Sequence, residues 1–188
     1  MKIQDSGMPA ENMWANFFEP QLILKKMGLN SNMNDIVDLG SGYGTFSIPA
    51  AKIIKGKVHA FDIDYGMISK TKEKIKEMGI ANINIYLRDF IKKGTSLLPN
   101  TIDYVMLFNI LHHNNPYQIL NEVYKILKKD AIASIIHWRS DIETPRGPAL
   151  DIRPNQQICK KWALESGFKI QKEMFLEPYH FGIIIKKI

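Results

Sequence analysis

The chain has 188 residues and a formal net charge of +6, with 45% hydrophobic and 23% charged residues. These values are ordinary for one soluble domain with a substantial core, and no apolar run approaches the ~18 residues that cross a bilayer. The single cysteine, Cys159, excludes an internal disulfide and a thiolate metal cluster. The opening MKIQDSGMPAEN has no apolar signal-peptide core, so we expect a cytoplasmic protein without a membrane segment or a metal site.

The positive charge comes mainly from lysines scattered along helix-like segments, such as Lys70, Lys72, Lys74 and Lys76. A nucleic-acid surface would favour a basic stripe interleaved with aromatic residues, and the sequence has no such stripe. Solvated helix faces are therefore the preferred interpretation of these lysines. An attraction to anionic partners is left open.

The first expected element is a helical cap. Residues 10–28 have the pattern of two short helices separated at Glu19 and Pro20. Bulky side chains, Trp14 among them, give the first of these helices a broad apolar face. Trp14 can either close over a ligand or pack against the rest of the domain.

Strand-like and helix-like segments then alternate, which is typical of an α/β domain with crossover helices. The expected strands are 35–39, 57–62, 82–87, 101–108 and 131–138. The expected helices are 46–54, 65–78, 116–129 and 155–166. The last two strand patterns, 168–176 and 179–187, are too close together for a helical crossover, so they must pair as an antiparallel hairpin.

Residues at the ends of these helices have the expected capping chemistry. Asp64 and Asn115 precede two of the helices as N-caps, and Pro116 occupies a first helical position. Gly79 and Gly167 follow helices as C-terminal stops.

The stretch IVDLGSGYGTFS, residues 36–47, places three glycines directly after a short buried strand pattern. Such a turn either permits unusual backbone dihedrals or lets the backbone approach a ligand, whose anionic part the next helix N-terminus attracts. The spacing is not GxGxxG, because Thr45 stands where a dinucleotide fingerprint has glycine, and no Gly-Lys-Ser/Thr follows as in a P-loop. The turn by itself therefore supports a ligand site only weakly.

Two acids follow the next two expected strands. Asp62 ends the second strand, where its carboxylate can accept hydrogen bonds from both hydroxyls of a ribose. Asp89 follows the third strand, where it can accept from an exocyclic amine, and Phe90 beside it can pack on a base. Together with the glycine turn, these placements predict a nucleoside-containing ligand.

With these motifs, residues 36–138 resemble class I S-adenosylmethionine-dependent methyltransferases, in particular those with a methyltransferase-11-like domain. The resemblance implies a Rossmann-like methyltransferase fold, with a seven-stranded, mostly parallel sheet, a C-terminal antiparallel hairpin and helices on both faces. It implies one domain over 1–188, with a helical cap at 1–34, a cofactor-binding core at 35–138, and a substrate loop, helix and hairpin at 139–188. The cofactor would be S-adenosylmethionine, and the product S-adenosylhomocysteine.

The resemblance also implies roles for individual residues. The glycine turn would hold the methionine part of the cofactor, although Asp38 can equally brace the turn through hydrogen bonds to backbone amides. The segment FNILHH would bring an asparagine beside the methionine tail. The implied residues are Asp38, Gly40, Gly42 and Gly44 for the methionine part, Asp62 for the ribose, Asp89 with Phe90 for the adenine, and Asn109 for the tail.

A sulfonium activates the methyl group before transfer, so the protein's task is to hold an acceptor in line for SN2 displacement and to exclude water. This task predicts a dry, aromatic-lined acceptor pocket. For each candidate, packing in the core or simple solvent exposure is the competing role. The substrate-side candidates are Trp14, Tyr43, Trp138, Arg146 and Tyr179.

A general base is needed only if the acceptor must lose a proton. His137 and His180 are weak candidates, and catalytic residues are otherwise unassigned. His112 and His113 are better explained as packed or capping histidines. Cys159, inside a helical pattern, is expected to be inert.

We expect the acceptor to be a small molecule, because the sequence has no appended nucleic-acid-binding module and no Asn/Asp-Pro-Pro-Tyr motif at residues 109–112. The alternatives are an RNA or protein methyltransferase and a non-catalytic S-adenosylmethionine-binding protein. A dehydrogenase would need the other glycine spacing. The sequence does not decide the acceptor atom, the oligomeric state, or whether the N-terminal helices act as a lid.

Overall fold

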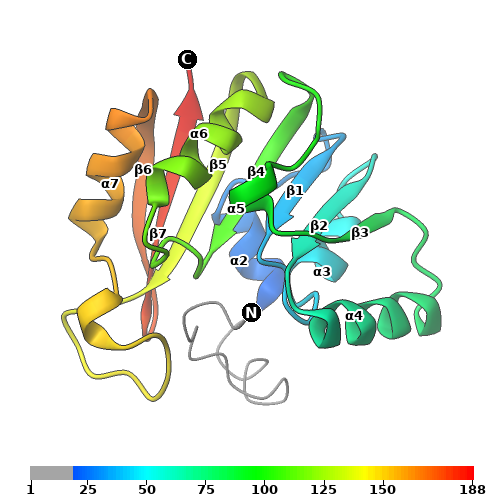
Figure 1. The fold of residues 1–188 in the computed structure, drawn as a ribbon, viewed down its shortest axis with the longest axis horizontal. Helices are drawn as coiled ribbons and strands as arrows, with labels where there is room; N and C mark the ends of the chain where they lie inside the picture. Colours follow the sequence, from blue (N-terminus) through cyan, green and yellow to red (C-terminus); the bar gives the residue numbers. More distant parts are fainter. Residues whose placement is uncertain (1–18) are drawn as a thin grey trace.

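A seven-stranded β-sheet runs through residues 19–188, the part of the chain that the computed structural model describes (Figure 1). The strands are β1 (Ile36–Leu39), β2 (Val58–Asp62), β3 (Ile83–Leu87), β4 (Ile102–Phe108), β5 (Leu127–Trp138), β6 (Phe168–Leu176) and β7 (His180–Lys187). Their order across the sheet is β3-β2-β1-β4-β5-β7-β6. The expected α/β fold with seven strands is confirmed.

The strand directions place a ligand-binding position between β1 and β4. Strands β3, β2, β1, β4 and β5 pair in parallel, whereas β7 runs antiparallel to both β5 and β6, which confirms the C-terminal hairpin. Strands β2 and β3 lie on one side of β1, and β4 lies on the other. In an open α/β sheet, ligands bind beyond the carboxyl ends of the strands at such a reversal.

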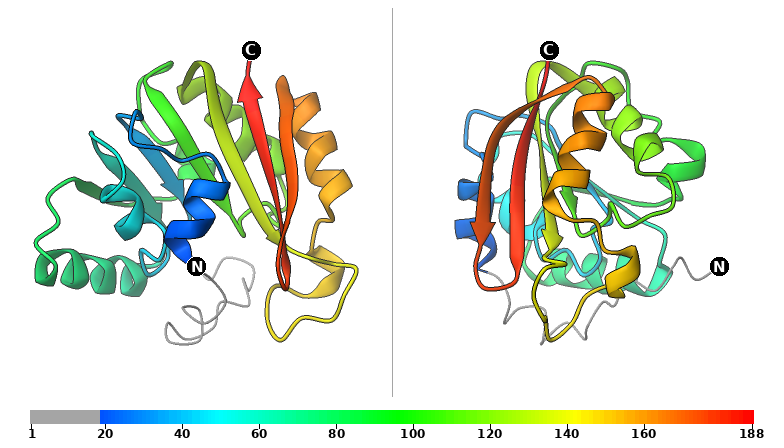
Figure 2. Two further views of the ribbon diagram at one scale, coloured as in Figure 1. Left: turned by 180° about the vertical axis from the view of Figure 1, so that it is seen from behind. Right: turned by 90° about the vertical axis from the view of Figure 1, so that its left-hand side faces the viewer.

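Helices cover both faces of the sheet (Figure 2). They are α2 (Pro20–Lys26), α3 (Ser47–Ala51), α4 (Tyr65–Glu77), α5 (Phe90–Lys93), α6 (Pro116–Ile126) and α7 (Gln156–Glu165), with a 3₁₀ turn η1 (Leu150–Ile152) before α7. Helices α2 and α3 lie on one face, and α5, α6 and α7 lie on the other. Helix α4 packs against β2 and β3 and lies along the lower edge of the sheet in Figure 1.

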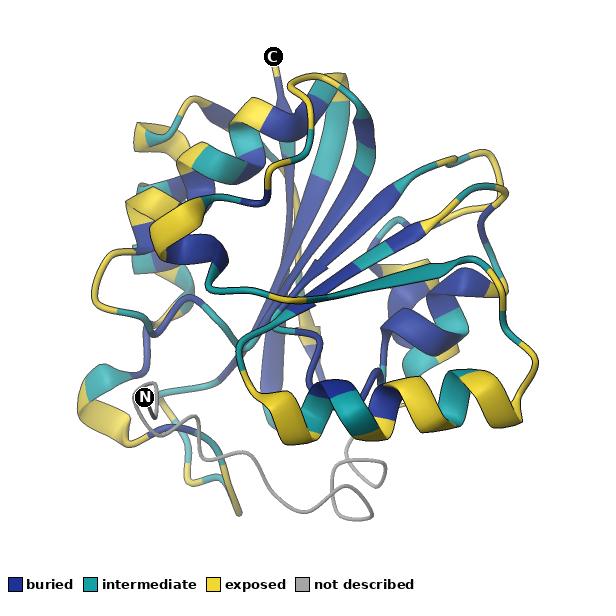
Figure 3. Ribbon diagram, turned by 45° about the vertical axis from the view of Figure 1, so that its right-hand side comes forward, coloured by how far each residue is buried: buried dark blue, intermediate teal, exposed yellow. Residues whose placement is uncertain are grey.

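Each face of the sheet has its own hydrophobic core. The α2/α3-side core includes Leu24, Tyr104 and Met106, and the α6/α7-side core includes Leu107 and Ile119. The central strands are near-continuous apolar runs because both of their faces are covered. Figure 3 shows them buried along most of their length, with exposed residues on the outer sides of the helices.

The predicted caps form, although α6 ends at Ile126 rather than at 129 and α3 covers 47–51 rather than 46–54. The Asp64 carboxylate accepts hydrogen bonds from two backbone amides at the start of α4. The side chains of Asn115 and Asn155 each accept one, at the starts of α6 and α7. Pro116 is the first residue of α6, and Gly79 follows α4 with a φ of 64°. Local capping chemistry therefore fixes where these helices begin and end.

Some element boundaries differ from the expected ones. Strand β5 begins at Leu127 rather than at 131, because Leu127 pairs with Ile102 before a shift in register. Within this stretch the backbone of Asp130 is turn-like, with a φ of 65°. Helix α5 was not predicted, since four residues are too few to show a helical period.

The helical cap is described only in its second half. Helix α2 corresponds to the second expected helix, and Ile23 and Leu24 pack in the α2/α3-side core. The first expected helix, with Trp14, lies outside the described residues.

Candidate functional site

The turn that follows β1 requires glycine at three positions. Gly40, Gly42 and Gly44 have φ angles of 79°, 52° and 73°, in a left-handed region that other residues rarely adopt. A Cβ on Gly40 would lie 3.1 Å from Cδ1 of Ile110, and one on Gly44 would lie 2.8 Å from Cγ2 of Thr71. The backbone and its packing therefore account for the glycines, and the binding site has to be argued from other groups.

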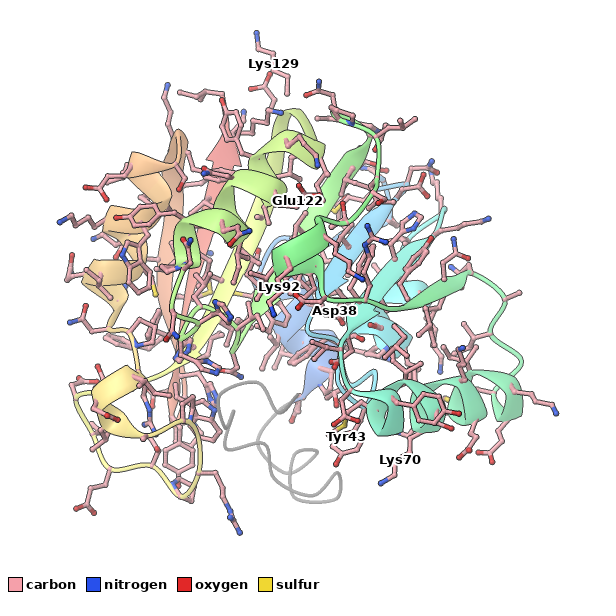
Figure 4. All side chains as sticks on the ribbon, in the orientation of Figure 1. Asp38, Tyr43, Lys70, Lys92, Glu122 and Lys129 are labelled. Carbon is pink, nitrogen blue, oxygen red and sulfur yellow. The ribbon has the colours of Figure 1, made fainter. Side chains whose placement is uncertain are left out.

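Helix α4 holds the carbonyl groups of this turn. Oγ1 of Thr71 donates to the Gly42 carbonyl oxygen at 2.9 Å, and Nζ of Lys74 donates to that of Tyr43 at 3.0 Å. The ammonium groups of Lys70 and Lys74 also lie 5.3 and 5.7 Å from the centroid of the Tyr43 ring, and Figure 4 shows Tyr43 beside Lys70 below the sheet. The solvated role expected for Lys74 is therefore wrong, and Thr71 was not singled out, because no local pattern links these residues to a turn 31 and 29 positions away.

Asp62, at the end of β2, contacts the same turn. Its Oδ2 accepts a hydrogen bond from the Gly42 amide at 2.8 Å, and its Oδ1 accepts one from the Asp64 amide at 2.9 Å. Burial raises the pKa of the Asp62 carboxyl group, and these amide hydrogen bonds oppose the rise. The two amides fix the orientation of the carboxylate, whose remaining lone pairs can accept from the hydroxyls of a ligand.

Asp38 lies in β1, buried beneath the turn (Figure 4). Its Oδ2 accepts a hydrogen bond from the Ser47 hydroxyl at 2.5 Å, so it joins β1 to the first residue of α3. Burial raises the pKa of Asp38 to about 7; the Ser47 hydrogen bond opposes this rise, and the charge of Asp62 adds to it. Asp38 therefore braces the turn through a side-chain hydroxyl, where the sequence suggested backbone amides.

Two buried polar side chains beside the turn have no hydrogen-bond partner within residues 19–188. They are the amide of Asn109, directly after β4, and the hydroxyl of Ser41 in the turn itself. Asn109 has a φ of 54°, and its backbone N–H donates to the Ile136 carbonyl oxygen at 2.7 Å. Sequence analysis indicated Asn109 but missed Ser41, because a serine in a glycine-rich turn gives no distinct signal.

Leaving such groups unpaired in a buried place costs about 1–3 kcal/mol each. Asn109 and Ser41 follow β4 and β1, which are neighbours at the reversal of the sheet. This is where the topology predicts a ligand. A polar ligand at this position would supply the missing partners.

Asp89 and Phe90 follow β3 as expected, and both have structural roles. The Asp89 carboxylate caps α5 by accepting from the Lys92 amide at 3.1 Å, and Nζ of Lys92 lies 3.9 Å from Oδ2 of Asp89. The Phe90 ring belongs to the α6/α7-side core and is 6% exposed. Their adenine-binding roles stay predictions.

Beyond β5, three of the residues expected near a substrate are packed together. The Trp138 indole is 1% exposed, and its centroid lies 4.0 Å from that of His180 and 6.2 Å from that of Tyr179. The antiparallel pairing of β5 with β7 sets Trp138 opposite His180, which explains the ring contact. Arg146 lies on the exposed surface of the loop after β5. The substrate roles of these residues stay predictions.

The candidate bases are buried histidines. Nε2 of His137 lies 3.3 Å from Nδ1 of His112, and Nδ1 of His137 lies 3.3 Å from the Trp138 carbonyl oxygen. Burial lowers the pKa of His112 to about 4 and that of His180 to about 3, and it holds the pKa of His137 well below 6.5. These rings are neutral and weakly basic at pH 7. Their packing agrees with a structural role for His112 and weakens the assignment of His137 or His180 as a base.

The remaining candidates add no chemistry to the site. Trp14 lies outside the described residues. Cys159 is buried in α7, and burial raises the pKa of its thiol, which agrees with the expected inertness. Within the described residues, no three His, Cys, Asp or Glu side chains are grouped to hold a metal ion. None of the helices in residues 19–188 has the length and apolar character that crossing a bilayer requires.

Comparison with known proteins gives a family match over most of the chain. A family model described as a methyltransferase domain matches residues 29–177. The match includes the glycine turn, Asp62, Asn109 and Trp138.

Individual relatives agree with this match. The solved structure of a SAM-dependent methyltransferase from Aquifex aeolicus superposes with a TM-score of 0.83 at 25% identity, over 92% of this chain and 91% of that one. Ribosomal RNA small subunit methyltransferase A from Wigglesworthia glossinidia brevipalpis is 25% identical over 143 residues, 68% of this chain and 53% of that protein. The biotin biosynthesis bifunctional protein BioHC from Teredinibacter turnerae is 29% identical over 101 residues, 50% of this chain and 17% of that protein. The chain thus spans about half the length, or less, of these two curated relatives.

Proposed function

Because the chain belongs to the methyltransferase-domain family, with S-adenosylmethionine as its cofactor, we propose that it transfers the cofactor's methyl group to a small-molecule acceptor. The observation that carries this proposal is a pair of buried polar groups, on Asn109 and Ser41 at the reversal of the sheet, that find no hydrogen-bond partner in residues 19–188. A turn with a purely structural role does not require buried polar groups without partners. A bound ligand with several polar groups would form hydrogen bonds with them.

The residues at the turn fit the cofactor chemically. S-adenosylmethionine carries a carboxylate, an ammonium group and ribose hydroxyls, and these can pair with amide, hydroxyl and carboxylate side chains such as those of Asn109, Ser41 and Asp62. We assign Asp38, Gly40, Gly42, Gly44 and Asn109 to the methionine part, Asp62 to the ribose, and Asp89 with Phe90 to the adenine.

The protein's contribution to the reaction is positioning. When bound, S-adenosylmethionine supplies a methyl group that its sulfonium already activates for nucleophilic attack. Tyr43 and Tyr179 would exclude water and orient an acceptor for in-line displacement, and the buried Trp138 would support Tyr179 from within the domain. Positioning of this kind can lower a barrier by about 7–11 kcal/mol, so the proposal assigns no general base.

Two measurements test the proposed function. Calorimetry with S-adenosylhomocysteine should show binding to the full chain, and incubation of a fractionated cell extract with methyl-labelled S-adenosylmethionine should place label in a small-molecule fraction. Binding without any labelled product would favour a non-catalytic S-adenosylmethionine-binding protein. Absence of binding would refute the cofactor site.

An RNA acceptor is the second candidate, and two observations favour it. One is the similarity to a ribosomal RNA methyltransferase over 68% of the chain. The other is α4, which lies beside the glycine turn and exposes Lys70, Lys72 and Lys76. Label recovered in RNA, together with RNA binding that weakens steeply as salt is raised, would replace the small-molecule acceptor with this one.

A further inference from the structure

The loop between β5 and α7, residues 139–153, projects past the carboxyl ends of the strands (Figure 1). Helix α4 borders the same edge of the sheet on the far side of the glycine turn. A long loop at an active edge is often mobile and closes only on a ligand. The contacts of this one indicate a fixed conformation.

Arg153 ties the loop together from its buried side. Its guanidinium donates to the Pro148 carbonyl oxygen at 2.6 and 3.2 Å, to the Arg139 carbonyl oxygen at 2.8 Å and to Oγ1 of Thr144 at 2.8 Å. A further contact, at 3.4 Å, reaches the Arg146 carbonyl oxygen. The side chain is buried, and none of the ion pairs among residues 19–188 includes it. One planar set of N–H donors therefore fixes four points of the loop.

Gly147 brings the loop into direct contact with Trp138. Its φ is 114°, and a Cβ at this position would lie 2.9 Å from Cγ and 3.0 Å from Cδ2 of Trp138, and 2.9 Å from Nη2 of Arg153. Only a residue without a side chain lets the backbone come this close to the indole. Trp138 in turn contacts His180 of β7, so the loop and the β5–β7 pair form one packed unit.

We propose that the 139–153 loop is a preformed wall of the acceptor pocket, and that Gly147 and Arg153 determine acceptor specificity by fixing the height of this wall over Trp138. The inference rests on the proposed methyltransferase function. In it, the loop backbone itself faces the acceptor, the buried Trp138 indole supports that backbone from beneath, and Arg153 is a positioning residue that touches neither substrate nor cofactor. Because the wall is already in place, acceptor binding does not include the cost of ordering a loop.

Limited digestion with trypsin tests the wall before any acceptor is known. The bonds after Arg139 and Arg146 are potential cleavage sites in the loop, whereas residue 153 precedes Pro154 and is resistant with either Arg or Lys. Cleavage of a folded protein follows the population of locally open states. Arg153→Met should therefore speed cleavage after Arg146 by about tenfold or more, while the affinity for S-adenosylhomocysteine stays within about twofold.

Two further variants separate the wall from general stability. Gly147→Ala should speed cleavage through its φ of 114° and its clash with Trp138, whereas Gly79→Ala is a control for a side chain at positive φ, since its φ is 64° and its Cβ would meet nothing within 4 Å. Arg153→Lys, with three donors in place of five, should give an intermediate rate. Once the acceptor is identified, Gly147→Ala should raise its KM by about tenfold with the cofactor KM unchanged, the split expected when uniform acceptor binding is lost.

The outcomes of these experiments separate the two proposals. Wild-type cleavage rates in both Arg153→Met and Gly147→Ala would overturn the preformed wall. An equal loss of S-adenosylhomocysteine affinity in both variants would also overturn it, because the effect would then not be confined to the acceptor side. Failure of the wild-type chain to bind S-adenosylhomocysteine would instead overturn the proposed function, and the cleavage result would still report on the loop.

Discussion

The proposed cofactor side of the site, at β1, β2 and β4, differs in construction from the proposed acceptor side, at β5 and β7. On the cofactor side, short segments after each strand present backbone amides, small residues and carboxylates, with the Asp62 carboxylate bonded to the Gly42 amide. On the acceptor side, large side chains pack on one another, as Trp138 does on His180. Arg153, at the end of the adjoining loop, holds that loop through hydrogen bonds to its carbonyl groups.

This difference predicts how each side responds to change. Within residues 19–188 the side chains of Asn109 and Ser41 make no hydrogen bond, and Asp62 accepts from backbone amides, so a substitution on this side should remove a ligand contact with little effect on the fold. The acceptor side depends on mutual packing, so a substitution there should act through stability or loop order. The largest effect is therefore expected on ligand affinity at the cofactor side.

Asp62→Ala should weaken S-adenosylhomocysteine binding by about 100-fold, since hydrogen bonds to a charged group contribute about 1.5–3 kcal/mol each and the proposed ribose contact has two. Calorimetry measures the change. Asp64→Ala is the control: it removes the N-cap of α4 and should cost about 1 kcal/mol of unfolding free energy, with little loss of affinity. Equal affinity in Asp62→Ala and the wild type would refute the ribose assignment.

Asn109→Gly should lower the affinity by about tenfold and change the free energy of unfolding by less than about 1 kcal/mol. Glycine adopts the φ of 54° freely, and the amide it removes has no partner among the described residues. Asn115→Ala should show the reverse, a loss of helix stability with the affinity unchanged, because Asn115 caps α6. A large loss of stability in Asn109→Gly would mean that the amide serves the fold rather than a ligand.

Whether a feature of either side could be predicted from the sequence depends on how far apart along the chain its contacting residues lie. Gly40, Asp62 and Asn109 each lie at a strand end, so the order of strands and a few residue types predicted the cofactor side, and the N-caps at Asp64 and Asn115 were equally local. Ser41 is part of the turn but has no distinguishing spacing.

The acceptor side was less predictable, because its contacts join residues that the chain separates widely. Trp138 was indicated by its place after a strand, but its contact with His180 depends on β7 pairing with β5. Arg153 bonds within its own loop but also gave no signal, since only the folded protein defines the conformation of that loop. On the cofactor side, Thr71 gave no signal for the same reason.

On the acceptor side, acid should destabilise the protein through its buried histidines. The pKa of His180 falls from 6.5 to about 3 and that of His112 to about 4. Below pH 6.5 the unfolded chain therefore takes up protons that the folded chain refuses, and stability decreases as the pH falls. His180→Asn should reduce this dependence by about 1 kcal/mol between pH 6.5 and 5.5.

Denaturant unfolding at a series of pH values measures the slope. His113→Asn is the control, because His113 is only partly buried and makes no ring contact with His137. If His180→Asn kept the wild-type slope, the buried ring would not be the source of the acid sensitivity.

Asp38 should act in the opposite direction. Its pKa of about 7 lies above the ordinary value of 3.8, so the folded state holds more protons between these values and loses stability as the pH rises toward 7. Asp38→Asn should remove this part of the pH dependence, and the variant should gain stability relative to the wild type above pH 7. Unfolding curves at pH 5 and pH 8 measure it, and a constant difference between the two proteins would contradict a buried, titrating carboxyl.

The place of β7 bears on how the protein is made. The last strand along the chain is an inner strand, inserted between β5 and β6, and Nζ of Lys187 donates to the Tyr124 and Leu127 carbonyl oxygens. During synthesis, β1 to β5 can therefore assemble while the outer edge of β5 still has no neighbour, a state that is open to pairing with other chains. That edge is covered only after residues 180–187 have left the ribosome, so premature termination within β7 should give an aggregating product rather than a shortened enzyme.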